Sequence, residues 1–246
     1  LAYGQRTCIL EEYHSLPLPY QPTPFLMTSI TERLNRLRQM ISEMEINAST
    51  SGLAHPNLLL APGAFDLLSN QIPMRVEWLT PYVRICLVGR MLSAMDRLQQ
   101  PRLALCMLHY QSALADAIDD EADRIADMAY DHYEGPPEDY VRVLTLIKES
   151  MNLEERRLQD YTNLDVPLEI WRRRYGTDIL FDPVERTFVW EECIPRVEKE
   201  LASAIGNRHP DMDSCYSYWE LKTSILQRHG IEWKSPAVMN PELQFT

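Results

Sequence analysis

Apolar residues recur every three or four positions in several long segments of this chain. The first such segment follows Ser29 and Glu32, whose spacing is that of a capping box; its apolar positions are Ile30, Leu34, Leu37, Ile41 and Met44. This period places the apolar side chains on one face of a helix, whereas a strand would alternate them. The pattern therefore predicts a mainly α fold.

Prolines and glycines divide the chain into segments of helical length. Its 246 residues include 17 prolines and only 8 glycines, a composition that suits helices with proline at their ends. We expect roughly six to eight helices, packed as an irregular multi-helix bundle. The inward positions predict a core made of Leu34, Leu37, Ile41, Val83, Leu87, Leu98, Leu114, Ile118, Ile125, Leu144 and Ile147.

Two segments depart from the helical pattern. Residues 179–181 and 187–190 are apolar or β-branched and flank Asp182 and Pro183, a turn signal. We therefore expect a short β-hairpin near residues 179–190, with a helix from about Pro195 to Ile205 after it. Residues 47–65 are expected to form a loop.

The N-terminal residues are rich in proline. Pro17, Pro19, Pro22 and Pro24 fall within eight residues, which forbids a helix and favours an extended path. We expect an extended arm over residues 1–27, laid over the domain or docked on another chain. Residues 28–246 are expected to form a single helical domain, with a sub-boundary near 135–137 or 162–167 as the alternative.

An acidic stripe dominates the electrostatics. The net charge is −12, and residues 116–139 hold ten acids against one arginine. At 100° per residue, six aspartates share a helix face about 120° wide, opposite Leu114, Ile118 and Ile125. Such a field repels nucleic acid and anionic membranes, so we expect neither as a partner. A solvated face and a site for a basic partner protein both fit these residues: Asp116, Asp119, Asp120, Asp123, Asp127 and Asp131.

Within this stripe, Asp119, Asp120 and Asp123 spell D-D-x-x-D. The pattern resembles the aspartate-rich motif of class I terpenoid synthases and prenyltransferases, which implies a Mg²⁺-dependent enzyme whose three carboxylates hold the metal at a diphosphate. The second metal motif of these families is missing, because "DMDSCYSYWE" lacks the required hydroxyl residue and no second D-D-x-x-D occurs. We therefore expect no metal or cofactor, and keep Mg²⁺ as the alternative.

A second resemblance involves residues 19–45 and 75–98. They look like the helical half of GINS replication-complex subunits, through a proline-led entry, a long first helix and the run Tyr82-Val83-Arg84. The likeness covers at most about 75 residues, and the chain beyond does not resemble the small β-domain of that family. No assignment follows from it.

Local signatures of catalysis are missing from the sequence, which has no phosphate-binding loop, dinucleotide glycine motif or nucleophile elbow. The run "WRRRYG" at 171–176 is interpreted as a helix end whose arginines complement the helix dipole, with a phosphate or nucleic-acid contact as the alternative. Five cysteines without C-x-x-C predict reduced thiols, with Cys86 and Cys106 buried, in an intracellular, reducing compartment.

These observations predict a non-catalytic helical interaction or scaffold protein. It would be a subunit of a larger assembly, with its acidic helix face available to a basic partner protein. The Mg²⁺-dependent enzyme is one alternative, and a viral or capsid-like structural protein is a second. No catalytic residue is named on this basis.

Overall fold

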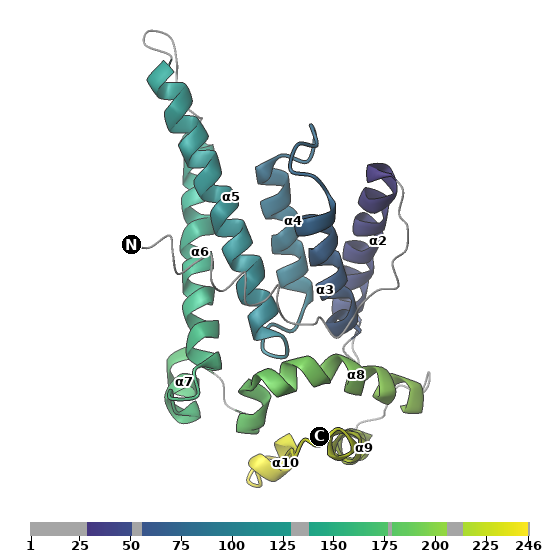
Figure 1. Ribbon diagram of the computed structural model, residues 1–246. Coiled ribbons are helices and arrows are strands. Elements are labelled where there is room, and N and C mark those ends of the chain that lie inside the picture. Colours follow the sequence, from purple (N-terminus) through teal and green to yellow (C-terminus); the bar gives the residue numbers. More distant parts are fainter. Residues whose placement is uncertain (1–28, 51–55, 129–137, 177–178, 206–213, 246) are drawn as a thin grey trace.

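The computed structural model describes residues 29–50, 56–128, 138–176, 179–205 and 214–245, and leaves undescribed the side chains of residues 121–141 and 214. The arm predicted for residues 1–27 lies outside these ranges. Within them the chain is helical, as expected, and contains no strand (Figure 1).

Five helices run up and down beside one another (Figure 1). Ser29 begins the first of them through the predicted capping box, since its hydroxyl accepts from the Glu32 amide and its own amide donates to the Glu32 carboxylate. A π-helical turn, Leu67–Gln71, extends the second. The five are α2 (Ile30–Ser49), α3 (Asn57–Asp66), α4 (Pro81–Ala94), α5 (Pro101–Met128) and α6 (Glu138–Thr162).

The core of this bundle contains most of the residues predicted for it. Leu34, Leu37, Ile41, Leu114 and Leu144 are buried. A further five are partly buried against the same core, and the side chain of Ile125 lies outside the described residues. Those five are Val83, Leu87, Leu98, Ile118 and Ile147.

A second layer crosses one end of the bundle. Helix α8 (Phe188–Ile205) arches beneath the five helices, and α9 (Ser214–Arg228) and α10 (Pro236–Met239) lie under it (Figure 1). Its core centres on Trp190, Ile194, Val197 and Leu226, and takes in Leu58 of α3. The short helix α7 (Leu168–Tyr175) packs against the end of α6 and ends at Gly176, whose φ of 72° is left-handed.

The β-hairpin expected near residues 179–190 is wrong. Asp182 and Pro183 begin a 3₁₀ turn, Pro183–Arg186, in which the Asp182 carboxylate accepts from the Val184 amide. The Thr187 hydroxyl then accepts from the Trp190 amide, so the apolar run 188–190 becomes the first turn of α8 rather than a strand. Short apolar runs fit either structure, and here burial of one helical face decides.

Helix α8 also shows that Pro195 does not start a helix. It lies inside α8 and is buried there. A proline in this position removes one backbone hydrogen bond and bends the helix, which fits the arched path in Figure 1.

The loop expected over residues 47–65 is partly wrong as well. Helix α3 occupies most of it and contains Pro62. Asn57 starts this helix from a buried position, where its amide nitrogen donates to the carbonyls of Met44 and Ala94. These bonds tie the start of α3 to the ends of α2 and α4.

Candidate protein-interaction surface

A buried carboxylate holds the first turn of α5. Glu191 of α8 accepts hydrogen bonds from the backbone amides of Arg102 and Leu103 at 3.0 Å each, and from the Arg102 guanidinium at 3.1 Å. Burial raises the pKa of Glu191 above its usual value, while these donors oppose the rise. The carboxylate takes the place of an N-cap side chain, because it satisfies amides that the helix itself cannot.

Helix α6 packs antiparallel along α5 (Figure 1). Leu144, Met151 and Leu158 of α6 are buried on the side facing the bundle. Nε2 of His109 on α5 lies 3.0 Å from the Glu155 carboxylate on α6. The two helices therefore form one hairpin. The end at which α5 finishes and α6 begins, here called the tip, points away from the α8 layer.

The acidic stripe borders this helix pair. Nζ of Lys148 on α6 lies 3.2 Å from the Asp116 carboxylate and also contacts that of Asp119. Partial burial works against the charge of Lys148, yet its hydrogen bonds to Asp119 and Asp116 raise its pKa overall. Asp120 is exposed. Lys148 thus neutralises part of the stripe and leaves Asp120 facing solvent.

The other candidate residues give less information. Asp123 and Asp127 lie on α5 with undescribed side chains, and Asp131 lies outside the described residues. Among the described side chains, no group of three His, Cys, Asp or Glu residues could hold a metal ion. Since Lys148 already occupies the Asp119 carboxylate, the geometry offers no support for the D-D-x-x-D magnesium site.

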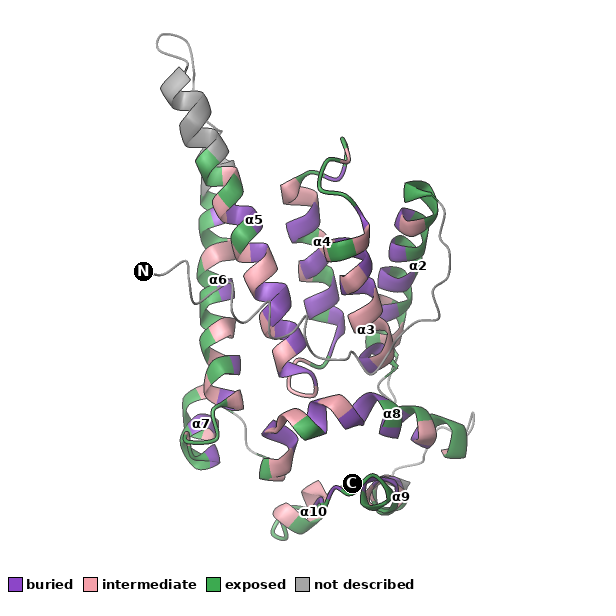
Figure 2. Cartoon of the chain, in the orientation of Figure 1, coloured by how far each residue is buried: buried purple, intermediate pink, exposed green. Residues whose placement is uncertain are grey.

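The outer face of α6 carries exposed apolar side chains. Val143, Leu146 and Leu153 are exposed by 41%, 54% and 65%, and Ser150 lies exposed between them. Their spacings of three, four and three place the four residues in one stripe, here called the α6 seam. The exposed residues of α6 lie along its outer side in Figure 2.

Charged residues follow one edge of the α6 seam. Arg142, Glu149 and Arg156 are all exposed and are spaced by seven residues, so they lie on one side of the stripe. This face was not among the residues predicted from the sequence. A second apolar period on α6, offset from the inward Leu144 and Ile147, was the signal that could have identified it.

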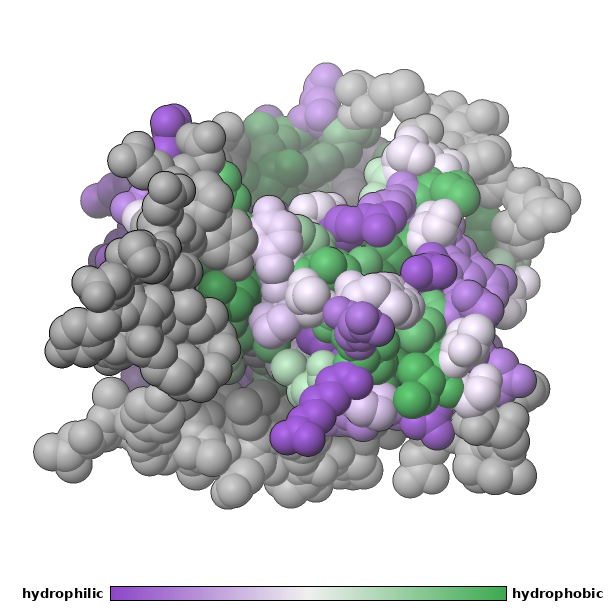
Figure 3. All heavy atoms as spheres, turned by 90° about the horizontal axis from the view of Figure 1, so that it is seen from above, coloured by the Kyte–Doolittle hydropathy of each residue, from purple (hydrophilic) through white to green (hydrophobic). Residues whose placement is uncertain are grey.

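A further exposed apolar group lies at the end of the bundle opposite α8. Ile30, Met74 and Trp78 are exposed there by 44% to 49%, and the Arg38 guanidinium stacks 4.7 Å from the Trp78 ring centre. Among the coloured atoms of Figure 3, hydrophobic residues gather near the middle of this end with hydrophilic residues around them.

The buried ionisable groups of the α8 layer are satisfied within the fold. The Glu198 carboxylate accepts from Lys222 at 2.7 Å and from the Tyr218 hydroxyl at 3.1 Å. The ammonium of Lys222 lies 5.4 Å to 5.9 Å from the ring centres of Trp190, Tyr218 and Trp233. This lysine fills a box of aromatic rings in which a ligand cation would otherwise be held.

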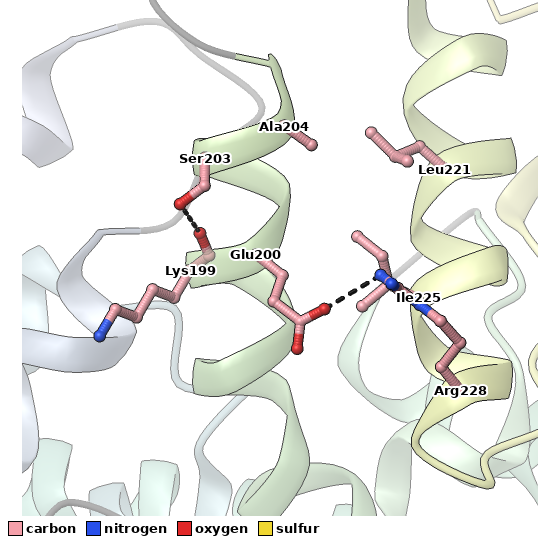
Figure 4. A pocket seen from close by; sticks show the side chains of 7 residues that line it. All are labelled: Lys199, Glu200, Ser203, Ala204, Leu221, Ile225 and Arg228. Atoms are coloured by element: carbon pink, nitrogen blue, oxygen red, sulfur yellow. Dashed lines mark hydrogen bonds and ion pairs between the residues drawn. The ribbon is translucent and has the colours of Figure 1, made fainter.

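An open groove of about 420 Å³ lies between α8 and α9 (Figure 4). Glu200 accepts from Arg228 at 3.0 Å, and Lys199 extends away from α9. Between them the groove is lined by the apolar side chains of Ala204, Leu221 and Ile225. Its lining is Lys199, Glu200, Ser203, Ala204, Leu221, Ile225 and Arg228.

The arginines of residues 171–176 lie in the last turn of α7, at the end of that helix. Arg174 lies 2.5 Å from the Asp160 carboxylate, which also accepts from the Tyr175 hydroxyl at 2.7 Å. The Trp171 indole donates to the Arg157 carbonyl inside a small aromatic core. Trp171, Arg174 and Tyr175 therefore all make contacts within the fold that hold α7 against α6.

The cysteines of the described ranges are free thiols. Burial raises the pKa of Cys106 to about 12, which suppresses its thiolate. Cys86 is exposed rather than buried as expected, and Cys8 lies outside the described residues.

Within the described ranges, no helix combines the length and apolar character that crossing a membrane requires.

Comparison of the chain with protein-family models, curated proteins and solved structures finds no match. Function is therefore argued from the surface itself.

Proposed function

We propose that this chain is a non-catalytic subunit of a larger protein assembly, and that it binds its partner through the α5–α6 hairpin. The observation that carries this proposal is the exposed α6 seam. Leu153 keeps 65% of its surface exposed and Leu146 keeps 54%, although both lie on a well-packed helix. An apolar stripe with a polar border is typical of a surface that another chain covers.

The acidic face of α5 contributes charge to the same hairpin. Asp120 is exposed, and Asp116 and Asp119 share one lysine between two carboxylates. Excess negative charge speeds the association of a basic partner and favours it over acidic proteins. The acids therefore contribute mainly to partner choice, and the α6 seam contributes the apolar area.

Affinity purification of the tagged full-length protein from its native source tests this proposal. We expect a partner at stoichiometric amount, with capture reduced by Asp120→Lys and unchanged by Asp165→Lys, an exposed acid that precedes α7. Mass spectrometry identifies what co-elutes. A monomer that elutes alone at physiological salt contradicts the proposal.

A further inference from the structure

The α6 seam has the spacing of a helix-binding surface. Val143, Leu146, Ser150 and Leu153 occupy the two apolar positions of successive heptads, and Arg142, Glu149 and Arg156 recur every seven residues along one edge. A partner helix lying along α6 would place its own apolar side chains between these four. The small Ser150 leaves room at the centre for a bulky apolar side chain.

The order of charges argues against a second copy of this chain as the occupant. In an antiparallel pair of α6 helices, Arg142 would face Arg156 of the second copy, and Glu149 would face its own equivalent. In a parallel pair, Glu149 would approach Glu154 of the second copy, which already pairs with Arg97 and Arg157. Like charges oppose association in both arrangements.

The exposed charges match a different helix. From the charge order we infer that the α6 seam binds an amphipathic helix of a partner protein, in which an acidic, a basic and an acidic residue are spaced by seven beside an apolar stripe. The order arginine–glutamate–arginine reads the same in both directions, so it selects this pattern whichever way the partner helix runs. This inference rests on the proposed function and specifies its partner.

Two labelled synthetic peptides of three heptads test the inference on the full chain. Both carry leucine at the apolar positions, and one has the flanking order Glu-Lys-Glu while the other has Lys-Glu-Lys. We expect fluorescence anisotropy at low salt to show the first peptide binding about tenfold more tightly, as three matched rather than mismatched exposed pairs would give. Leu146→Glu with Leu153→Glu should abolish binding of both peptides.

A charge-reversed protein provides the matched control. The combined variant Arg142→Glu, Glu149→Lys and Arg156→Glu should reverse the preference, and since all three residues are exposed, its circular dichroism should stay unchanged. Equal affinity for both peptides, or an unchanged preference in the reversed variant, overturns the inference.

Other occupants give different results. A dimer seen by sedimentation that Leu146→Glu dissociates would identify a second copy. Peptide binding that appears only after deletion of residues 1–27 would identify the proline-rich segment. Either result overturns the inference. A native partner that stays bound to the Leu146→Glu, Leu153→Glu variant also overturns it and leaves the proposed function standing, whereas a lone monomer removes both.

Discussion

Glu191 is one of the side chains that join the α8 layer to the bundle. It lies on α8, is 8% exposed, and binds two amides and one guanidinium at the start of α5. No local sequence pattern could identify it, because donor and acceptor are 89 residues apart in the chain. Its burial and its contacts indicate a structural role.

Glu191→Ala should therefore destabilise the fold by about 2 kcal/mol, since it leaves two helix amides and the charge of Arg102 without their acceptor. Urea unfolding of the variant measures this cost. Glu192→Ala is the matched control, because Glu192 follows Glu191 directly on α8 and is only partly buried. A loss for Glu191→Ala no larger than that of the control would contradict the capping role.

Glu185 makes stability depend on pH. Burial raises its pKa above 4.5, although the Trp233 indole donates to its carboxylate at 2.7 Å. Between pH 4.5 and that raised pKa the folded protein binds more protons than the unfolded chain. The free energy of unfolding contributed by this group therefore increases as pH falls through the interval, and decreases as pH rises.

Glu185→Gln keeps an oxygen for the Trp233 indole and removes the titration. We expect the gain in free energy of unfolding between pH 7 and pH 4.5 to be smaller in this variant than in the wild type. Urea titrations at the two pH values measure the difference. Glu232→Gln changes an exposed residue next to Trp233 and should match the wild type. Equal gains in all three proteins would exclude Glu185 as the source.

The two faces of helix α6 should contribute differently to the free energy of unfolding. Leu158 has no exposed surface, whereas Leu153, five residues earlier, is 65% exposed. Leu158→Ala should cost about 3 kcal/mol because it leaves a cavity, and Leu153→Ala should change stability by less than about 0.5 kcal/mol. Urea unfolding compares them directly. A large cost at Leu153 would mean that the α6 seam is covered within the chain.

Helical elements could be predicted from the sequence where one apolar stripe was long. The capping box at Ser29 and the helix end at residues 171–176 were predicted correctly, and so were four of the five apolar positions of α2, whereas Ile30 is exposed. Asn152 and Glu155 have the spacing of a capping box, which would begin a new helix, but in the structure one continuous helix runs through both. Its inward stripe continues through Met151 to Leu158, so packing holds the two halves together.

Other elements could not be predicted because their reasons are distant in the chain. Helix α3 tolerates Pro62 because the Gln100 side chain donates to the Leu58 carbonyl, which Pro62 leaves without its helical donor. The sequence around Pro183 resembles that of a hairpin, but residues 188–190 form a helical turn because α8 buries Trp190 and Ile194 against α9. Lys148 shows the same limit for the candidate site, because only the α5–α6 contact brings it to Asp116 and Asp119.

Charge is unevenly distributed over the whole molecule. The acidic part of α5 lies toward the tip of the α5–α6 hairpin, while the arginine-rich helix α7 lies at its base beside the α8 layer (Figure 1). Arg174 pairs with Asp160 there, so the base is more nearly neutral than the tip. The basic partner that we propose would therefore be drawn first toward the tip, from which the α6 seam extends along the same helix pair.

The two layers should unfold together, because their cores share residues. Leu58 of α3 belongs to the core of the α8 layer, and Glu191 ties α8 to α5. Three of the five tryptophans, Trp190, Trp219 and Trp233, lie in that layer, so tryptophan fluorescence reports mainly on it, while far-UV circular dichroism is dominated by the longer helices of the bundle. We expect the two signals to change at the same urea concentration in the wild type.

In Glu191→Ala the fluorescence change should come at a lower urea concentration than the ellipticity change, since the layer then keeps fewer contacts with the bundle. Separate transitions in the wild type would show instead that the α8 layer and the bundle are independent units, and that Leu58 and Glu191 couple them too weakly to matter.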